Sequence, residues 1–283
     1  MTSVQLRRLS RELVRLRTEA GKTGAEVTKA MGWSAGRLGY YEQGKWQRAD
    51  IGNVARLLTY YGVTDPEREA LLDLARQSRI KGWWASYKDI FPTSLAGFEN
   101  AATLIRTCET SVVPGLLQTL DYTVALLQRG VLPADESVIQ RKAEGRRARQ
   151  KILERENPPD LWAVIDEAAL LRLVGGADVM RAQLRHLVEM AAWPRITIQV
   201  LPLVAGAHPG VDGGFEILDF ASPEDTPLVH VEGAVNSLFM ENPGDVQRYT
   251  LIFSHVISAA LTPDESISHM AELQDRLEKG RGT

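Results

Sequence analysis

Residues 23–44, TGAEVTKAMGWSAGRLGYYEQG, constrain the fold of this chain more than any other stretch. Thr23 is a preferred N-cap residue, and Glu26 three positions later completes a capping box. Val27 and Met31 lie one helical turn apart, and Gly32 suits the left-handed residue that ends many helices. The pattern therefore predicts a helix that ends in a tight turn.

A second helix is expected directly after this turn. Ser34 is its predicted N-cap, Leu38 and Tyr41 point inward, and Gly44 closes it. Small residues on the outward side would let this helix lie deep in a major groove, and an arginine there can contact guanine through two hydrogen bonds. The outward positions are Ala35, Gly36, Arg37, Gly39 and Tyr40.

The flanking segments complete a helical domain, which we place at residues 1–80. A first helix is expected to end at Gly21, because leucines and an alanine recur at spacings of three and four: Leu6, Leu9, Leu13, Leu16 and Ala20. A fourth helix would run from an Asp50 cap to Gly62. A fifth would begin at Asp65-Pro66, with the proline in its first turn.

This domain resembles the lambda-repressor-like helix-turn-helix family, also called the XRE family. The matching residues are Gly32 at the turn, Ser34, Leu38 and the closing Glu42-x-Gly44. The family usually has a phosphate-contacting glutamine where this chain has Gly24. The resemblance implies binding to double-stranded DNA, with Thr23, Ser34, Arg37 and Tyr40 on the DNA side. It also implies a homodimer, since one recognition helix reads too few base pairs.

Charge is distributed as such a role requires. Residues 1–62 contain 11 Lys and Arg against 5 Asp and Glu, whereas the whole chain has a net charge of −3. The positive end would face phosphate and the remainder would avoid it. Lys45, Gln47 and Arg48, in the loop after the second helix, are placed to contact the DNA backbone.

Length and composition limit the remaining possibilities. A chain of 283 residues with 44 % hydrophobic residues suggests about two domains with real cores. The single cysteine, Cys108, excludes an intrachain disulfide, so a reducing cytoplasm is the expected location. Cys108 lies in TLIRTCET, which we read as a helix. No apolar run approaches the roughly 18 residues of a membrane span, and the N-terminus lacks the apolar core of a signal peptide.

Residues 81–283 are predicted to form an α+β domain, a small sheet packed by helices. We expect two helices over 95–129, interrupted at 113–115, and a charged, solvated helix over 135–156. Further helices begin at Glu167 and at an Asp178 cap and cover 243–260 and 263–279. Alternating β-branched residues predict strands at 161–165, 195–201, 215–220, 228–232 and 237–241.

The second part is similar to an actinobacterial domain of unknown function that follows a helix-turn-helix in many Streptomyces regulators of the WhiJ-like type. The similarity lies in ETSVVPGLLQTLDYTVALL, WAVIDEAALLR, QLRHL and IQVLPLVAGAHPGVDGGF. It implies a transcriptional repressor, often encoded beside a small partner protein in an arrangement likened to toxin and antitoxin.

The residues indicate no enzyme, metal site or cofactor. The five histidines are scattered without ligand spacing. The loop 206–214 could use His208 and Asp212 as polar anchors for a ligand, although we favour a wide turn bonded to its own backbone. Glu109 and Gln118 flank a helical bend, where they could line a pocket, form a partner surface or cap helix ends. Trp83 and Trp84 suit an interdomain seam more than a ligand pocket.

Three hypotheses follow for the whole chain. The first is a sequence-specific transcriptional regulator, whose second domain binds a small-molecule effector or a small neighbour-encoded protein. The second is an antitoxin-like interaction protein, for which DNA binding serves autoregulation. The third, which we favour least, is an enzyme with a DNA-targeting head, and it would require an active site around His208.

Overall fold

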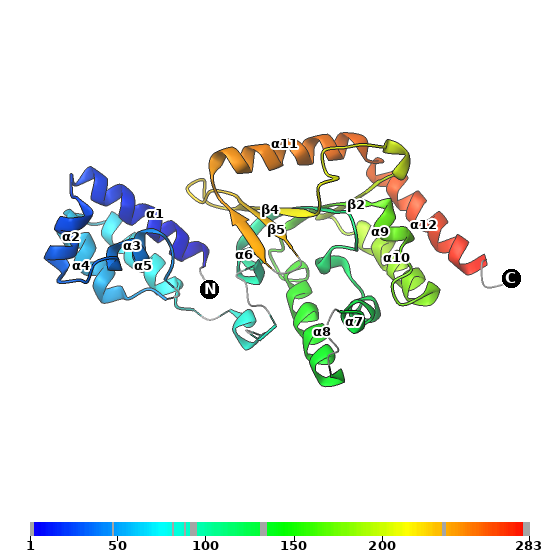
Figure 1. Ribbon diagram of the computed structural model, residues 1–283, viewed down its shortest axis with the longest axis horizontal. Coiled ribbons are helices and arrows are strands. Elements are labelled where there is room, and N and C mark those ends of the chain that lie inside the picture. Colours follow the sequence, from blue (N-terminus) through cyan, green and yellow to red (C-terminus); the bar gives the residue numbers. More distant parts are fainter. Residues whose placement is uncertain are drawn as a thin grey trace. The chain divides into compact units, whose positions relative to one another are not determined.

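The computed structural model describes residues 3–46, 48–80, 82–87, 89–90, 95–130, 135–233 and 236–279. The chain divides into two compact units, Met1–Ala101 and Ala102–Thr283 (Figure 1). The first unit thus extends past residue 80 to include the segment 82–101. Within the described ranges, none of the helices combines the length and apolarity that a membrane span requires.

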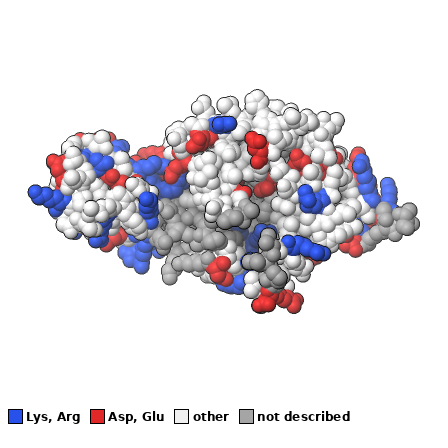
Figure 2. Space-filling view, viewed as in Figure 1, with Lys and Arg blue, Asp and Glu red and all other residues white. Residues whose placement is uncertain are grey.

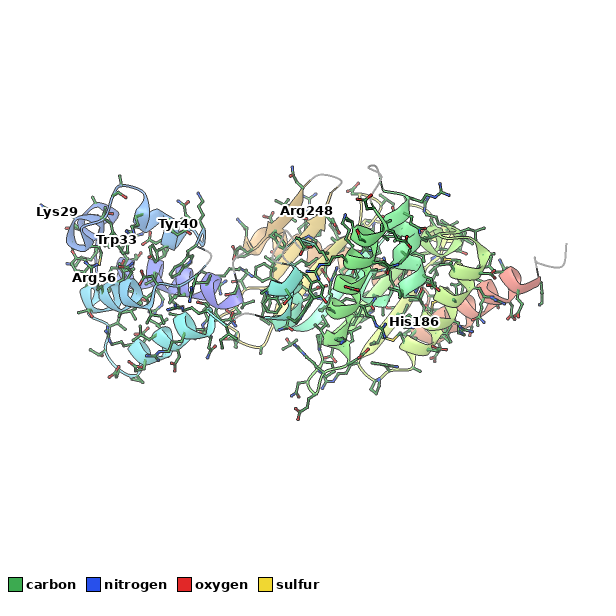
Figure 3. All side chains as sticks on the ribbon, turned by 90° about the horizontal axis from the view of Figure 1, so that it is seen from below. Lys29, Trp33, Tyr40, Arg56, His186 and Arg248 are labelled. Atoms are coloured by element: carbon green, nitrogen blue, oxygen red, sulfur yellow. The ribbon has the colours of Figure 1, made fainter. Side chains whose placement is uncertain are left out.

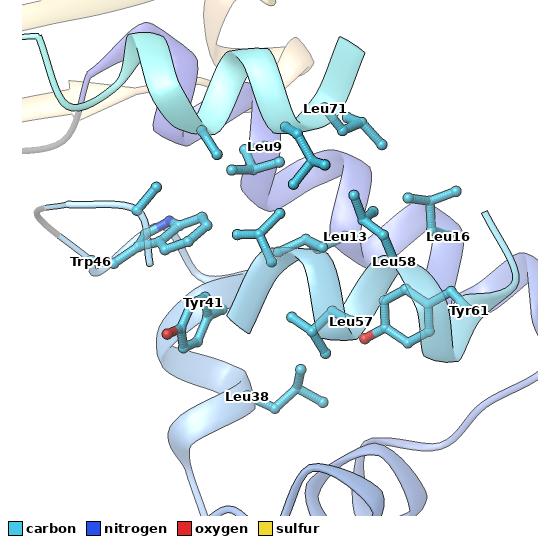
Figure 4. Packing of buried hydrophobic residues seen from close by; sticks show 14 of the residues in the cluster. Leu9, Leu13, Leu16, Leu38, Tyr41, Trp46, Leu57, Leu58, Tyr61 and Leu71 are labelled. Atoms are coloured by element: carbon cyan, nitrogen blue, oxygen red, sulfur yellow. The ribbon is translucent and has the colours of Figure 1, made fainter. Parts of the chain in front are cut away.

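The first unit is helical. Its helices are α1 (Val4–Glu19), α2 (Gly24–Met31), α3 (Arg37–Glu42), α4 (Ile51–Tyr61), α5 (Glu67–Gln77) and α6 (Leu95–Ala101), with a 3₁₀ helix at Trp83–Tyr87. One hydrophobic core joins the helices from α1 to α5 (Figure 4). It contains these predicted inward residues: Leu6, Leu9, Leu13, Leu16, Val27, Met31, Leu38 and Tyr41. Burial of these apolar side chains is the main force that holds the short helices together.

Trp46 is a core residue that the sequence pattern did not reveal. Its side chain is only 1 % exposed, although it follows α3 in a loop. The indole Nε1 donates a hydrogen bond of 2.7 Å to Ser10 Oγ, which satisfies the polar edge of the ring inside the core. The loop after α3 is therefore anchored to α1.

Of the three side-chain N-caps predicted for this unit, two are confirmed and one is wrong. Thr23 and Glu26 form the predicted capping box, and the Asp50 side chain accepts from Asn53 N. The predicted Ser34 cap is not formed, because α3 begins only at Arg37 and its cap residue is Gly36 at φ +86°. Ala35 and Gly36 consequently lie in the turn, since a glycine at positive φ delays the start of the helix.

The second unit is an α+β domain. Its strands are β1 (Ala102–Glu109), β2 (Asp160–Asp166), β3 (Ile196–Leu201), β4 (Phe215–Phe220), β5 (Leu228–Glu232) and β6 (Ser237–Met240). Within the described residues they form one sheet in the order β3-β2-β1-β4-β5-β6. The pairs β1–β2 and β2–β3 are parallel, and the other pairs are antiparallel.

Helices cover both faces of this sheet, as Figure 1 shows for α11 on one side and α7 and α8 on the other. The helices are α7 (Leu120–Gln128), α8 (Glu136–Gln150), α9 (Glu167–Leu171), α10 (Ala177–Ala191), α11 (Pro243–Ala259) and α12 (Pro263–Lys279). Phe253 and Val256 of α11 pack on an apolar face that includes Cys108, Ile217 and Val229. The opposite face carries a polar row across the strands, discussed below.

Several sequence predictions for this unit need correction. The segment read as a helix around TLIRTCET is the central strand β1, because Ile105 and Cys108 fill sheet faces rather than a helical stripe. Asp178 lies in the first turn of α10, whose cap residue is Gly176. The helix expected to be solvated, α8, buries Ile139, Ala143 and Gly145. The five later strands and the two closing helices are confirmed.

Candidate functional site

The exposed side of α3 is organised by a stack of aromatic rings. The Arg37 guanidinium lies 5.2 Å from the Trp33 ring centroid. Trp33 stacks on Tyr41 at 5.0 Å between centroids, and Tyr41 contacts the buried Trp46 at 4.6 Å. A surface arginine is thereby connected to the core, which restricts the positions that its side chain can adopt.

The other residues predicted to contact DNA are at the surface of the same unit. Tyr40 is 44 % exposed, Gly39 is half-buried, and Lys45 and Arg48 are exposed. Thr23, Ser34, Ala35 and Gly36 are exposed too, whereas Gln47 lies outside the described residues. Figure 3 labels Lys29, Trp33 and Tyr40 along one edge of this unit in its view.

Some cations of the first unit pair with carboxylates of the described chain, whereas those on α3 and in the loop after it do not. Arg15 is paired with Glu12, Glu19 and Glu67, and Arg17 forms an ion pair of 2.6 Å with Glu42. Over the described parts of the chain, no carboxylate pairs with Arg37, Lys45 or Arg48. On the face shown in Figure 2, the unit's basic side chains are interspersed with acidic ones. Cations near α3 are thus available for phosphate or base contacts.

Trp83 and Trp84 both belong to the first unit. Their rings meet edge to face with centroids 6.0 Å apart. Trp83 Nε1 donates to Asn100 Oδ1 at 3.3 Å, and the Trp84 indole lies close to the backbone of Gly97 in α6. The two indoles join the segment 82–87 to α6, so their apolar area is used in packing within this unit.

The second unit carries buried ionisable side chains on the sheet face opposite α11. The strand register aligns Thr107, Glu216, His230 and Phe239 in one row across β1, β4, β5 and β6. Glu109 lies two residues beyond Thr107, at the end of β1. Thr107, Glu216 and His230 are all buried. Burial of a row of polar side chains destabilises the fold unless they form hydrogen bonds or ion pairs. Such a row is therefore unusual on the face of a small sheet.

Glu109 has a strongly perturbed ionisation. Burial, with a smaller contribution from the nearby Glu232, raises the pKa of Glu109 to about 7 against the opposing effect of Arg149. Backbone also crowds the carboxylate, since a side chain added at Gly214 would come within 2.9 Å of Glu109 Oε2. The predicted helical bend between Glu109 and Gln118 is wrong, because Glu109 ends a strand. Perturbed carboxyl groups of this kind are common at functional sites.

His230 is a second perturbed group, which the sequence did not reveal. Burial lowers the pKa of His230 to about 4, so its ring is neutral near pH 7. The imidazole lies against Phe239 at 4.8 Å between centroids, and its Nδ1 is 4.0 Å from Glu216 Oε2. Its Nε2 is buried and has no hydrogen-bond partner among the residues that the structure describes. The sequence around His230 is that of an ordinary short strand, and it gives no indication that this histidine is buried with a lowered pKa.

Gln118, one of the predicted effector residues, lines a cavity. It follows a 3₁₀ turn at Gly115–Leu117, and its buried amide donates to Val113 O at 2.8 Å. The amide oxygen accepts from Thr123 Oγ1 and from Arg146 Nη1. The cavity has a volume of about 340 Å³ and lies between this segment, α8 and α10. Sequence reasoning missed its residues on α8 and α10.

His208 and Asp212 do not come together as ligand anchors. His208 Nδ1 accepts from Gly210 N at 3.2 Å, and its Nε2 is 3.7 Å from Asp166 Oδ2 at the end of β2. Asp212 is exposed. The loop between β3 and β4 therefore forms a turn bonded partly to its own backbone, as the favoured interpretation predicts. Gly210 in this loop lies against Cys108 and Val256.

Metal binding and thiol chemistry have little support from the geometry. Among the residues that the structure describes, no group of three or more His, Cys, Asp or Glu side chains could hold a metal ion. Burial raises the pKa of the Cys108 thiol to about 12, so the thiolate needed of a nucleophile does not form near neutral pH.

Comparison with known families agrees with this architecture. A helix-turn-helix domain matches residues 8–71, which identifies a DNA-binding regulator by its N-terminal part. Domain of unknown function (DUF5753) matches residues 92–272. Because this match covers more than half of the chain, the protein belongs to the DUF5753 family, with a helix-turn-helix domain before the family domain. No curated protein and no solved structure matches the chain.

Proposed function

We propose that this protein is a transcriptional repressor that binds an operator in double-stranded DNA as a homodimer. In this proposal Arg37 and Tyr40 of α3 read base edges in the major groove. Thr23 and the turn formed by Ser34, Ala35 and Gly36 approach the backbone, and Lys45 and Arg48 neutralise phosphates.

The stacked Arg37 is the observation that carries the proposal. It is exposed at the start of α3, held against Trp33, and without a carboxylate partner in the described chain. Arginine in the major groove can donate two hydrogen bonds to guanine, and a side chain already restricted loses less entropy on binding. The matched helix-turn-helix domain supports the same use of this surface.

The second unit, in our proposal, regulates DNA binding by taking up a small molecule or a small partner protein. The support is a cavity of about 340 Å³ beside a buried polar network. Sites for small molecules are usually concave and have a few polar groups that converge on them.

The direct test is fluorescence anisotropy with the DNA upstream of the protein's own gene and a scrambled duplex of equal length, at about 50 mM and 200 mM salt. We expect selective binding to the upstream DNA that weakens steeply with salt, because phosphate contacts release counterions. In vitro transcription from that DNA should fall as protein is added. Equal, weak binding to both duplexes would contradict the proposal.

A further inference from the structure

The cavity of the second unit is bounded by three separate elements. Gln118, Thr119, Leu120 and Thr123 contribute one wall at the start of α7. The facing wall is α8, with Ala143, Arg147 and Gln150, and α10 contributes His186 (Figure 3). We propose that this cavity binds a small anionic molecule, whose carboxylate or phosphate group is held by Arg147. That this molecule is the effector of the regulator rests on the function proposed above.

Three glutamines hold the wall of the cavity in place. Gln150 Nε2 donates to Gly115 O at 3.0 Å and to Gln118 O at 2.7 Å. Gln183, fully buried in α10, donates to Leu117 O and accepts from Thr119 N, both at 2.7 Å. Gln118 adds its bond to Val113 O. Side chains from two helices thus fix the backbone from 113 to 119, as a preorganised binding site requires.

The charge of the lining favours an anion. Among the described residues, the lining contains Arg147 and His186 but no carboxylate. Arg147 is exposed and has no ion pair or hydrogen bond among the described residues. A guanidinium matches the two oxygens of a carboxylate or phosphate with parallel hydrogen bonds. Burial lowers the pKa of His186, so at neutral pH this residue offers a hydrogen bond rather than a second charge.

Size and apolar lining restrict the body of the ligand. A volume of about 340 Å³ is near the lower end for small-molecule sites. Leu120, which is 45 % exposed, and the buried Ala143 both line the cavity. An exposed leucine next to an unpaired arginine suits a ligand with an apolar body and one acidic group. We therefore expect a small aromatic or aliphatic acid or phosphate ester.

The test uses full-length protein and the fluorescent anion 8-anilinonaphthalene-1-sulfonate as the probe. We expect saturable binding that weakens at least about tenfold in Arg147→Ala, in line with the loss of one charge-assisted contact. Arg141→Ala is the matched control, because Arg141 is also an exposed arginine of α8 but does not line the cavity. Competition by benzoate and by phenyl phosphate distinguishes a carboxylate ligand from a phosphate.

Leu120→Trp provides a second variant, which obstructs the cavity without a change of charge and should also weaken the probe. Circular dichroism checks that each variant is folded. No saturable binding to the folded parent, or equal binding by the parent and Arg147→Ala, would overturn the proposed site. A shift of the operator Kd by at least about threefold with saturating probe is expected of an effector, and no shift would remove that role.

Operator binding without the probe separates this inference from the proposed function. If the protein binds the probe through Arg147 but does not select its operator, the anion site is supported and the proposed regulatory function is contradicted. If the protein selects its operator but binds no probe, the regulatory function is supported and the anion site is contradicted.

Discussion

The residues packed around them determine the position or the pKa of the side chains most suited to function. Arg37 leans on Trp33, which stacks on Tyr41, so a surface cation is supported by the same rings that build the core. Glu109 and His230 have pKa values shifted by burial on the polar face of the sheet. The support of Arg37 and the shifted pKa values of Glu109 and His230 therefore come from tertiary neighbours, which residue type and sequence position do not specify.

Replacement of Arg37 tests whether it reads a base. Arg37→Ala should cost about 1–3 kcal/mol of operator binding and relax specificity at one base position. Arg76→Ala is the control, because Arg76 is an arginine of α5 whose ion pairs are with Asp73 and Glu69. Anisotropy titrations with operators changed one base pair at a time measure both effects. An unchanged Kd in Arg37→Ala would show that another residue reads the DNA.

Glu109 should give the second unit a particular pH dependence. A carboxyl with a pKa raised to about 7 stays protonated in the folded state while the unfolded chain already ionises near pH 4.5. The stabilisation that Glu109 contributes to the folded state is therefore fully present below pH 4.5 and is lost as the pH rises through 7. His230 acts oppositely, because its pKa falls to about 4 and it adds stability as pH rises toward 6.5.

The variant Glu109→Gln isolates this effect, since the amide does not titrate. Relative to the parent, its free energy of unfolding should increase by about 1–3 kcal/mol between pH 5 and pH 8. Urea unfolding at intermediate pH values measures the difference. Glu154→Gln, at an exposed carboxylate of the same unit, should follow the parent throughout. Parallel pH profiles for Glu109→Gln and the parent would refute the raised pKa.

Among the elements, the two helices of the DNA-binding hairpin start in different ways. Thr23 caps α2 with its side chain, whereas α3 starts after a left-handed glycine without any side-chain cap. Thr23→Ala should therefore destabilise the first unit by about 1 kcal/mol, and Ser34→Ala should change its stability by less than about 0.5 kcal/mol. Thermal unfolding of both variants measures this. A similar loss in the two would indicate that Ser34 caps α3 in solution.

Elements with local signals were predictable from the sequence. Caps at Thr23 and Asp50 and the glycines that end α2 and α4 specify helix ends through contacts within a few residues. Strand β1 was missed for a physical reason. It is a central strand whose buried residues lie on both faces, so they do not alternate, and Ile105 and Cys108, three residues apart, fit a helical stripe equally well. Its pairing with β2 and β4 decides the structure.

The candidate site of the second unit was predictable only in part. Gln118 is predicted at a helical bend as a residue that could line a pocket, and it does line the cavity. The sequence places Arg147 on a helix that is expected to be solvated, and it gives His186 no ligand spacing. They meet only because α8 and α10 pack against the start of α7. Tertiary contacts between distant segments leave no local pattern, so sequence periodicity could not reveal the cavity.

At the scale of the whole molecule, each of the two units has a buried hydrophobic cluster of its own within the described chain. The core of the first unit is formed by residues from 6 to 75, and the buried cluster under α11 by residues from 108 to 256. Positive charge is concentrated in residues 1–62, while the whole chain has a net charge of −3. We therefore expect attraction to the DNA backbone to be strongest at the helical unit.

The proposed homodimer predicts a dependence on operator geometry. Two recognition helices related by a twofold axis fit half-sites about 10 base pairs apart, because that spacing brings both major grooves to the same side of the DNA. Insertion of 5 base pairs between half-sites should abolish tight binding, and deletion of one half-site should weaken it similarly. Analytical ultracentrifugation of the complex should give two protomers per operator. Tight binding by one protomer, indifferent to the inserted base pairs, would mean that a single helical unit reads the whole site.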